Sequence, residues 1–136
     1  MVSSSNIWVA SPYHPVCTYL REEIAEQVEH DDIAPDFETF LERYRRRLSA
    51  RIEEGARRQN DMRKLRRKNG GKPLQSVFTR DCIERGMDID EGGARYNWVE
   101  CSFVGLANFA DSLQVIRQEV FEKRETSMEV LWQMLK

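Results

Sequence analysis

The side chains of this chain best suited to nucleophilic, redox or metal chemistry belong to three cysteines, Cys17, Cys82 and Cys101. Cys17 follows His14 in a His-x-x-Cys pair, a spacing that can begin a metal site. No second pair follows at ligand spacing, and structural zinc needs four ligands, so we expect no metal site. The odd number and wide separation of the cysteines favour free thiols over disulfides, which indicates a reducing compartment and a cytoplasmic protein.

Two of these cysteines are interpreted as packing residues. Cys82 keeps helical spacing with Phe78 and Ile83, and free cysteine is among the most buried residue types. Cys101 directly follows Glu100, and its surroundings favour a small packing side chain over a reactive thiol.

A glycine pair and five polar residues form the second group of candidates. Gly92 and Gly93 can cradle a phosphate or allow a tight backbone passage, and without a following Lys-Ser or Lys-Thr we favour the passage. The polar residues can line a reaction cavity or satisfy nearby backbone groups, and we favour the second role, with a catalytic carboxylate as the alternative for the aspartate. They are Tyr96, Asn97, Asn108, Asp111 and Ser112. We therefore assign no catalytic, cofactor-binding or metal-binding residue to this chain.

Apolar residues recurring at intervals of three and four predict that helices position these side chains. Asp36 is suited to cap the longest helix, Gly70 and Gly71 to end it, and Thr126 with Glu129 to open the last helix as a capping box. Any strand is expected between Ala94 and Phe103, where aromatic and β-branched residues gather. The sequence thus predicts a mostly α-helical chain with little strand, its helices covering about residues 16–28, 37–68, 74–83, 106–123 and 126–136.

Composition limits the class of protein. The 136 residues, 40% of them hydrophobic, suffice for one domain, and the apolar runs are far shorter than the roughly 20 residues that cross a membrane. The net charge is only -2, but residues 43–68 carry twelve basic against three acidic residues, a local charge of +9. This basic helix gives one functional hypothesis, a nucleic-acid-binding module, which the missing recognition motifs and the acidic remainder disfavour.

A second hypothesis comes from two linked motifs. One is Cys-Ile-Glu-Arg-Gly-Met-Asp-Ile-Asp-Glu-Gly-Gly-Ala-Arg-Tyr-Asn, beginning at Cys82, and the other is Gly-Leu-Ala-Asn-Phe-Ala-Asp-Ser-Leu, beginning at Gly105. Together they resemble the glycyl radical enzyme superfamily, the pyruvate formate-lyase and glycerol dehydratase group. Residues 36–59 and 115–123 are similar to flanking helices of the same family.

The resemblance implies a ten-stranded α/β barrel and a lyase, either a formate acetyltransferase or a diol or glycerol dehydratase. Such an enzyme cleaves a C–C or C–heteroatom bond of a small polar substrate. In this family a cysteine loop and a glycyl radical loop meet inside the barrel, and a separate radical S-adenosylmethionine enzyme installs the radical. The expected partners are that activating enzyme, the remainder of the barrel and a second copy of the parent enzyme; membrane and nucleic acid are not expected.

This sequence departs from the family at both reacting loops. Neither the Gly-Cys-x-Glu pattern of the cysteine loop nor the Arg-Val-Ser-Gly-Tyr pattern of the radical loop occurs in it. We therefore expect an internal fragment of a longer enzyme, inactive alone, with residues 36–136 a partial pyruvate formate-lyase-like domain and residues 1–35 unassigned. Because such a fragment lacks its packing partners, some of four apolar residues are expected to be exposed: Leu106, Phe109, Leu113 and Trp132.

Overall fold

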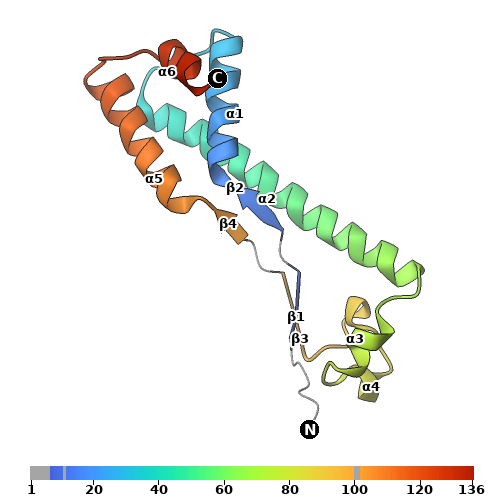
Figure 1. Cartoon of the computed structure of the whole chain (residues 1–136). Helices are drawn as coiled ribbons and strands as arrows, with labels where there is room; N and C mark the ends of the chain where they lie inside the picture. Colours follow the sequence, from blue (N-terminus) through green and yellow to red (C-terminus); the bar gives the residue numbers. More distant parts are fainter. Residues whose placement is uncertain (1–6, 11, 100–101) are drawn as a thin grey trace. The chain divides into compact units, whose positions relative to one another are not determined.

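The computed structural model describes residues 7–10, 12–99 and 102–136 (Figure 1). The chain forms two compact units. We call Met1–Tyr13 with Glu53–Ser102 the loop unit, and His14–Ile52 with Phe103–Lys136 the helical unit. Among the described residues, none of the helices is long and apolar enough to span a membrane.

The helical unit contains α1 (Val16–Glu29), the first half of α2 (Phe37–Lys68), α5 (Leu106–Val115) and α6 (Met128–Leu135). α1 contacts both α5 and α6 (Figure 1). The apolar sides of the helices meet in one core. The predicted amphipathic helices are therefore confirmed. Eight described residues form the buried centre of this core: Leu20, Ile24, Ala34, Phe40, Tyr44, Ile116, Met128 and Trp132.

The long helix α2 has the predicted bounds and the predicted cap. The carboxylate of Asp36 accepts a hydrogen bond from the backbone N–H of Thr39 at 2.7 Å, and this bond lowers the pKa of Asp36. Beyond the other end, Gly70 and Gly71 have φ angles of 96° and 62°, a left-handed backbone that glycine adopts without steric cost. The prediction that this glycine pair ends the helix is confirmed.

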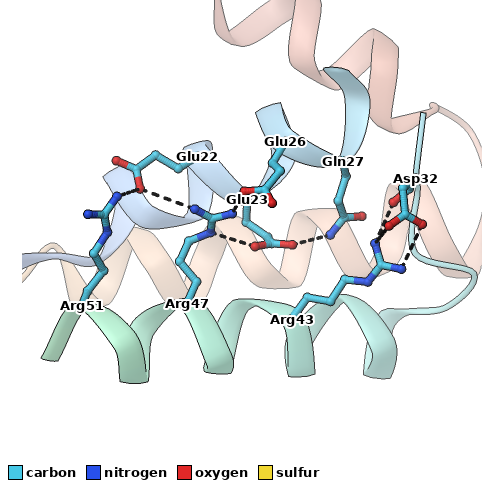
Figure 2. A network of polar contacts seen from close by, with 8 residues as sticks. All are labelled: Glu22, Glu23, Glu26, Gln27, Asp32, Arg43, Arg47 and Arg51. Carbon is cyan, nitrogen blue, oxygen red and sulfur yellow. Dashed lines mark hydrogen bonds and ion pairs between the residues drawn. The ribbon is translucent and has the colours of Figure 1, made fainter. Parts of the chain in front are cut away.

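Three arginines in the first half of α2, Arg43, Arg47 and Arg51, bind acidic residues of α1 and the turn after it (Figure 2). Arg47 donates through Nε to the buried Glu23 at 2.8 Å and also pairs with Glu26. Arg43 donates to both carboxylate oxygens of Asp32, at 3.0 and 3.1 Å. Charge along this helix face is thus neutralised inside the unit.

The same network reaches the backbone. Glu23 also accepts from Gln27 at 2.8 Å, and Gln27 in turn accepts from the backbone N–H of Ala34 at 2.9 Å. Since Glu23, Gln27 and Ala34 are all buried, each polar group finds a partner away from water. The chain of bonds fixes the turn between α1 and α2.

Two expectations for the last helices needed correction. The run predicted to Lys123 is helical, but after α5 it continues as a π-helix, η2 (Ile116–Glu122). The predicted capping box of Thr126 and Glu129 is wrong: Ser127 caps α6, its side chain accepting from the backbone N–H of Val130 at 3.3 Å. The backbone N–H of Thr126 donates instead to the carbonyl of Glu119, which holds Thr126 outside the helix.

The expected exposure of apolar residues is confirmed for one of the four. Leu106 is 56% exposed, whereas Trp132 lies in the core and Phe109 and Leu113 pack against it. The stripe on α5 is therefore only partly covered: Phe109 and Leu113 are half-buried, and no residue of α5 is fully buried.

The loop unit contains α3 (Pro73–Val77), α4 (Cys82–Arg85), the 3-10 helix η1 (Ile89–Glu91), β1 (Ile7–Ala10) and β3 (Tyr96–Val99). The single helix predicted over residues 74–83 is wrong, because Asp81 has a positive φ of 75° and separates α3 from α4. Gly86, with φ 62°, ends α4 as predicted. The buried centre among its described residues is small, consisting of Cys82, Ile89 and Ala94.

Strands occur where they were expected and also where they were not. β3 and β4 (Ser102–Val104) lie at the predicted segment, but β1 and β2 (Tyr13–Pro15) lie far upstream. β1 pairs in parallel with β3, Ile7 opposite Tyr96 and Ala10 opposite Val99, while β2 pairs with β4. The expectation that strands are confined to residues 94–103 is therefore wrong, because each upstream strand is specified by a partner almost ninety residues away.

Candidate functional site

The centre of the first sequence motif is the carboxylate of Asp88. It accepts hydrogen bonds from the backbone N–H groups of Lys72 and Asp90, both at 2.8 Å, and from the hydroxyl of Ser76 at 2.7 Å. Burial alone would raise the pKa of Asp88, but these hydrogen bonds outweigh it and lower the pKa. The anionic side chain joins α3 and its N-cap residue, Lys72, to η1.

A reciprocal cap locks the backbone beside Asp88. The backbone N–H of Asp88 donates to the Glu91 carboxylate at 3.1 Å, while the Asp88 side chain accepts from the N–H of Asp90. Ser76 Oγ additionally accepts from the buried N–H of Ile89 at 3.1 Å. Sequence analysis did not single out Asp88, although an acidic residue followed three positions later by glutamate is a cap signature.

The glycine pair after this cap allows a close backbone approach. A Cβ added to Gly93 would lie 2.1 Å from the carbonyl oxygen of Met87, and Gly92 has a φ of 92°. The favoured role of the pair, a tight backbone passage, is thus the one that the geometry supports.

The three residues Tyr96, Asn97 and Trp98 are exposed, but Asn97 is also bonded to the backbone. Asn97 donates through Nδ2 to the carbonyl oxygens of Ala94 and Gly92, at 2.8 and 3.2 Å, so its predicted backbone-satisfying role is supported. Tyr96 and Trp98 are exposed on β3, with ring centroids 5.9 Å apart.

Arg95 fixes the unusual backbone of Asp81. Its guanidinium donates to both carboxylate oxygens of Asp81 at 3.0 Å, and this bidentate bond is the main reason that the pKa of Asp81 is lowered. The pairing ties the start of α4 to the segment before β3.

Two residues of the second motif, Gly105 and Ser112, are also held by hydrogen bonds. Gly105 begins α5 with a φ of 85°, and its carbonyl oxygen accepts from Cys17 Sγ at 3.4 Å. Ser112 Oγ donates to the carbonyl oxygen of Asn108 at 2.7 Å, which supports a structural role for Ser112. The side chains of Asn108 and Asp111 are exposed on α5.

The histidine and cysteine side chains singled out in the sequence do not form a common site. His14 is buried, with Nδ1 3.4 Å from the hydroxyl of Tyr19, while Cys17 turns to Gly105. Within residues 7–10, 12–99 and 102–136, no three His, Cys, Asp or Glu side chains gather as metal ligands. Cys82 is buried as predicted, and burial raises the pKa of its thiol, whereas Cys101 lies outside the described residues.

The contacts within each motif are structural. Comparison with known proteins shows the family to which the motifs belong. The family model described as pyruvate formate lyase-like matches residues 19–136, which is most of the chain. The chain belongs to the pyruvate formate lyase-like family. It is therefore a member of the glycyl radical enzyme superfamily, as the sequence motifs indicated. The match includes residues 19–35, which sequence analysis left unassigned.

Two curated relatives of this chain are dehydratases. It is 44% identical over 59 residues to trans-4-hydroxy-L-proline dehydratase of Clostridioides difficile and 47% identical over 60 residues to (2S)-3-sulfopropanediol dehydratase of Klebsiella oxytoca. Each alignment covers 43% of this chain, but only 8% and 7% of the respective relatives.

Solved structures share the fold over nearly the whole chain. A Roseburia inulinivorans structure that concerns 1,2-propanediol dehydration matches 93% of this chain with a TM-score of 0.78 and 28% identity. The B12-independent glycerol dehydratase of Clostridium butyricum matches the same share with a TM-score of 0.77 and 18% identity, which bears on fold alone. This chain spans only 18% of the length of either structure. Since the chain is mostly helical and these relatives are glycyl radical enzyme barrels, the predicted fold class, a mostly helical piece of an α/β barrel, is confirmed.

The pyruvate formate lyase-like chain does not fit the radical centre of its superfamily. Both reacting-loop sequences are absent from its 136 residues. Gly93 lies against the carbonyl of Met87 and Cys82 packs with Ile89 and Ala94, and neither residue stands in the sequence pattern of a reacting loop. We derive no chemical step through this chain.

The alternative of nucleic-acid binding has no support. The basic helix bears Arg43 and Arg47 in the ion pairs described above, and further along it Arg66 binds the fully covered carboxylate of Asp90 at 2.9 Å. Cations already matched with carboxylates release fewer counterions from a phosphate backbone.

Proposed function

We propose that this chain is one portion of a glycyl radical dehydratase and supplies barrel strands and outer helices to it. In this proposal the cysteine loop and the radical loop belong to other parts of the enzyme, on the same or a neighbouring polypeptide. The substrate class is a small polar molecule that loses water through radical cleavage of a C–heteroatom bond.

The observation that carries this proposal is the parallel pair of β1 and β3. Parallel sheets normally occur in larger sheets with both faces covered, and a pair of parallel strands has two open edges. The match of 93% of the chain to a solved relative of more than five times its length supports the view that neighbouring strands belong at those edges.

A dehydratase is favoured over a formate acetyltransferase because the curated relatives reported above are dehydratases. The substrates in their names differ, one being a hydroxylated amino acid and the other a sulfonated diol, and what they share is a small polar substrate. A radical S-adenosylmethionine enzyme that activates the assembled protein, a dimeric parent enzyme and a cytoplasmic location complete the proposal.

The experiment is a chimera under anaerobic conditions. Residues 7–136, which include β1, replace the structurally equivalent segment of the Clostridioides difficile hydroxyproline dehydratase. Dehydration of trans-4-hydroxy-L-proline is measured together with the glycyl radical signal in electron paramagnetic resonance. We expect the chimera to be activated and to turn over, and the isolated 136-residue chain to do neither.

The matched control is the same chimera with Gly93→Ala. An added Cβ has no room beside the Met87 carbonyl, so this variant should lose activity through a displaced β3. Loss of activity in the chimera without the Gly93→Ala change, or turnover by the isolated chain, would contradict the proposed function.

A further inference from the structure

Four large apolar side chains are exposed on the short helices of the loop unit. Leu74 and Val77 belong to α3, Phe78 follows it, and Ile83 belongs to α4. Leu74 is 72% exposed and Ile83 is 69% exposed, although their spacing with Cys82 had predicted an inward stripe. We call Leu74, Val77, Phe78 and Ile83 the α3–α4 face.

The opposite side of these helices is firmly held. Ser76 is bonded to Asp88 and to the N–H of Ile89, and Cys82 packs in the small core with Ile89 and Ala94. Thr79, which is also buried, donates to the carbonyl oxygen of Gln75 at 2.8 Å. The α3–α4 face is therefore presented outward by a fixed backbone, and it is not free to turn inward.

The short helices of the loop unit expose more large apolar side chains than the centre of the unit buries. The buried centre has one large aliphatic side chain, Ile89, beside Cys82 and Ala94, whereas all four apolar residues of the face are exposed. Contiguous exposed apolar patches on soluble proteins commonly mark interaction sites.

The occupant of the face is argued from size. A stable dimer buries about 800 Å² on each partner, which is more than four partly exposed side chains can provide. A patch of this size suits one contact among many inside a larger fold. The solved relatives provide such a fold, since this chain spans only 18% of their length.

We propose that the α3–α4 face is a docking surface for the portion of the glycyl radical enzyme that lies outside this chain. This inference rests on the proposed function and adds to it the surface through which the scaffold joins the remaining barrel. The occupant is an apolar surface of the same enzyme, not a second copy of this chain.

The test uses the double variant Leu74→Gln with Ile83→Gln in two contexts. In the isolated chain both side chains are exposed, so the melting temperature and hydrogen-exchange protection should not change. In the chimera the same changes would place two amides in an apolar contact, and the half-life of activity at a fixed elevated temperature should fall about tenfold.

The matched control is Leu65→Gln on α2, a leucine that is 52% exposed in the same unit. It should leave both the isolated chain and the chimera unchanged. Equal loss in the control and the double variant would overturn the assignment to this face.

The remaining outcomes separate the two proposals. An active chimera that tolerates the double variant overturns the docking surface while leaving the proposed function intact. Concentration-dependent dimerisation of the isolated chain that the double variant abolishes identifies a second copy as the occupant and overturns the proposal. A parent chimera that cannot be activated counts against the proposed function, and the docking surface falls with it.

Discussion

The two units of this chain are stabilised in different ways. The helical unit buries aromatic and aliphatic residues from four helices, and its polar network runs across helix faces. The loop unit buries only three described residues at its centre and is organised by a carboxylate, Asp88, and a glycine, Gly93. The hydrophobic effect is non-directional, whereas hydrogen bonds and close backbone contacts depend on geometry. The loop unit should therefore be the more sensitive to single polar or steric changes.

The largest effect is expected at the core of the helical unit. Phe40 is fully buried, with its ring centroid 5.9 Å from that of Phe121, so Phe40→Ala should lower the free energy of unfolding by about 4 kcal/mol. Urea unfolding followed by circular dichroism measures the loss. The control Phe78→Ala removes a half-exposed ring from the loop unit and should cost less than about 1 kcal/mol. Similar losses for the two variants would show that the burial contrast is not what distinguishes the units.

The next effect tests steric sensitivity in the loop unit. Gly93→Ala should cost about 3 kcal/mol, because the new methyl group meets the Met87 carbonyl and the backbone must move. Gly70→Ala is the control: its Cβ enters open space, but its φ of 96° is unfavourable for alanine, so about 1 kcal/mol is expected. Hydrogen exchange of amides in residues 86–97 reports the difference. A harmless Gly93→Ala would remove the basis for a tight passage.

Acid should weaken the loop unit through Asp88. Its pKa is depressed in the folded chain, so the stability it contributes is present above the ordinary carboxyl pKa near 3.8 and is lost as pH falls through the folded value. Asp88→Asn should cost about 2 kcal/mol at neutral pH and flatten the acid limb of the stability curve. Exchange rates of the Lys72 and Asp90 amides, measured from pH 6 downward, provide the readout. An unchanged acid limb in the variant would assign acid sensitivity to other carboxylates.

Alkali should weaken the helical unit through Tyr44. Burial raises the pKa of Tyr44 from 10.0 to about 12, so its contribution is complete below pH 10 and is lost as pH rises through 12. Tyr44→Phe removes the hydrogen bond to the carbonyl of Val16 at 3.2 Å and should cost about 1 kcal/mol at neutral pH. Stability of the variant should depend less on pH between 10 and 12. If the two alkaline curves coincide, Tyr44 does not control this limb.

Local signals in the sequence predicted the helical unit well. The stripe from Phe37 to Ala56, the cap at Asp36 and the stop at Gly70 each act within a few residues of their own position. Prediction failed at Thr126 because the adjacent Ser127 is an equally good cap, and the bond from the Thr126 N–H to Glu119 decides between them. It failed over residues 74–83 because helical spacing does not reveal the positive φ of Asp81, which the distant Arg95 stabilises.

The sequence by itself determined the family, the long helix and the absence of both reacting-loop motifs, since motif residues and apolar spacing are properties of neighbouring positions. Only the tertiary structure decided that β1 pairs with β3, that Asp88 organises the loop unit and that the α3–α4 face points outward. Each of these depends on residues distant in the chain meeting in space. Their pairing energy appears only after the intervening chain has folded, so no local pattern records it.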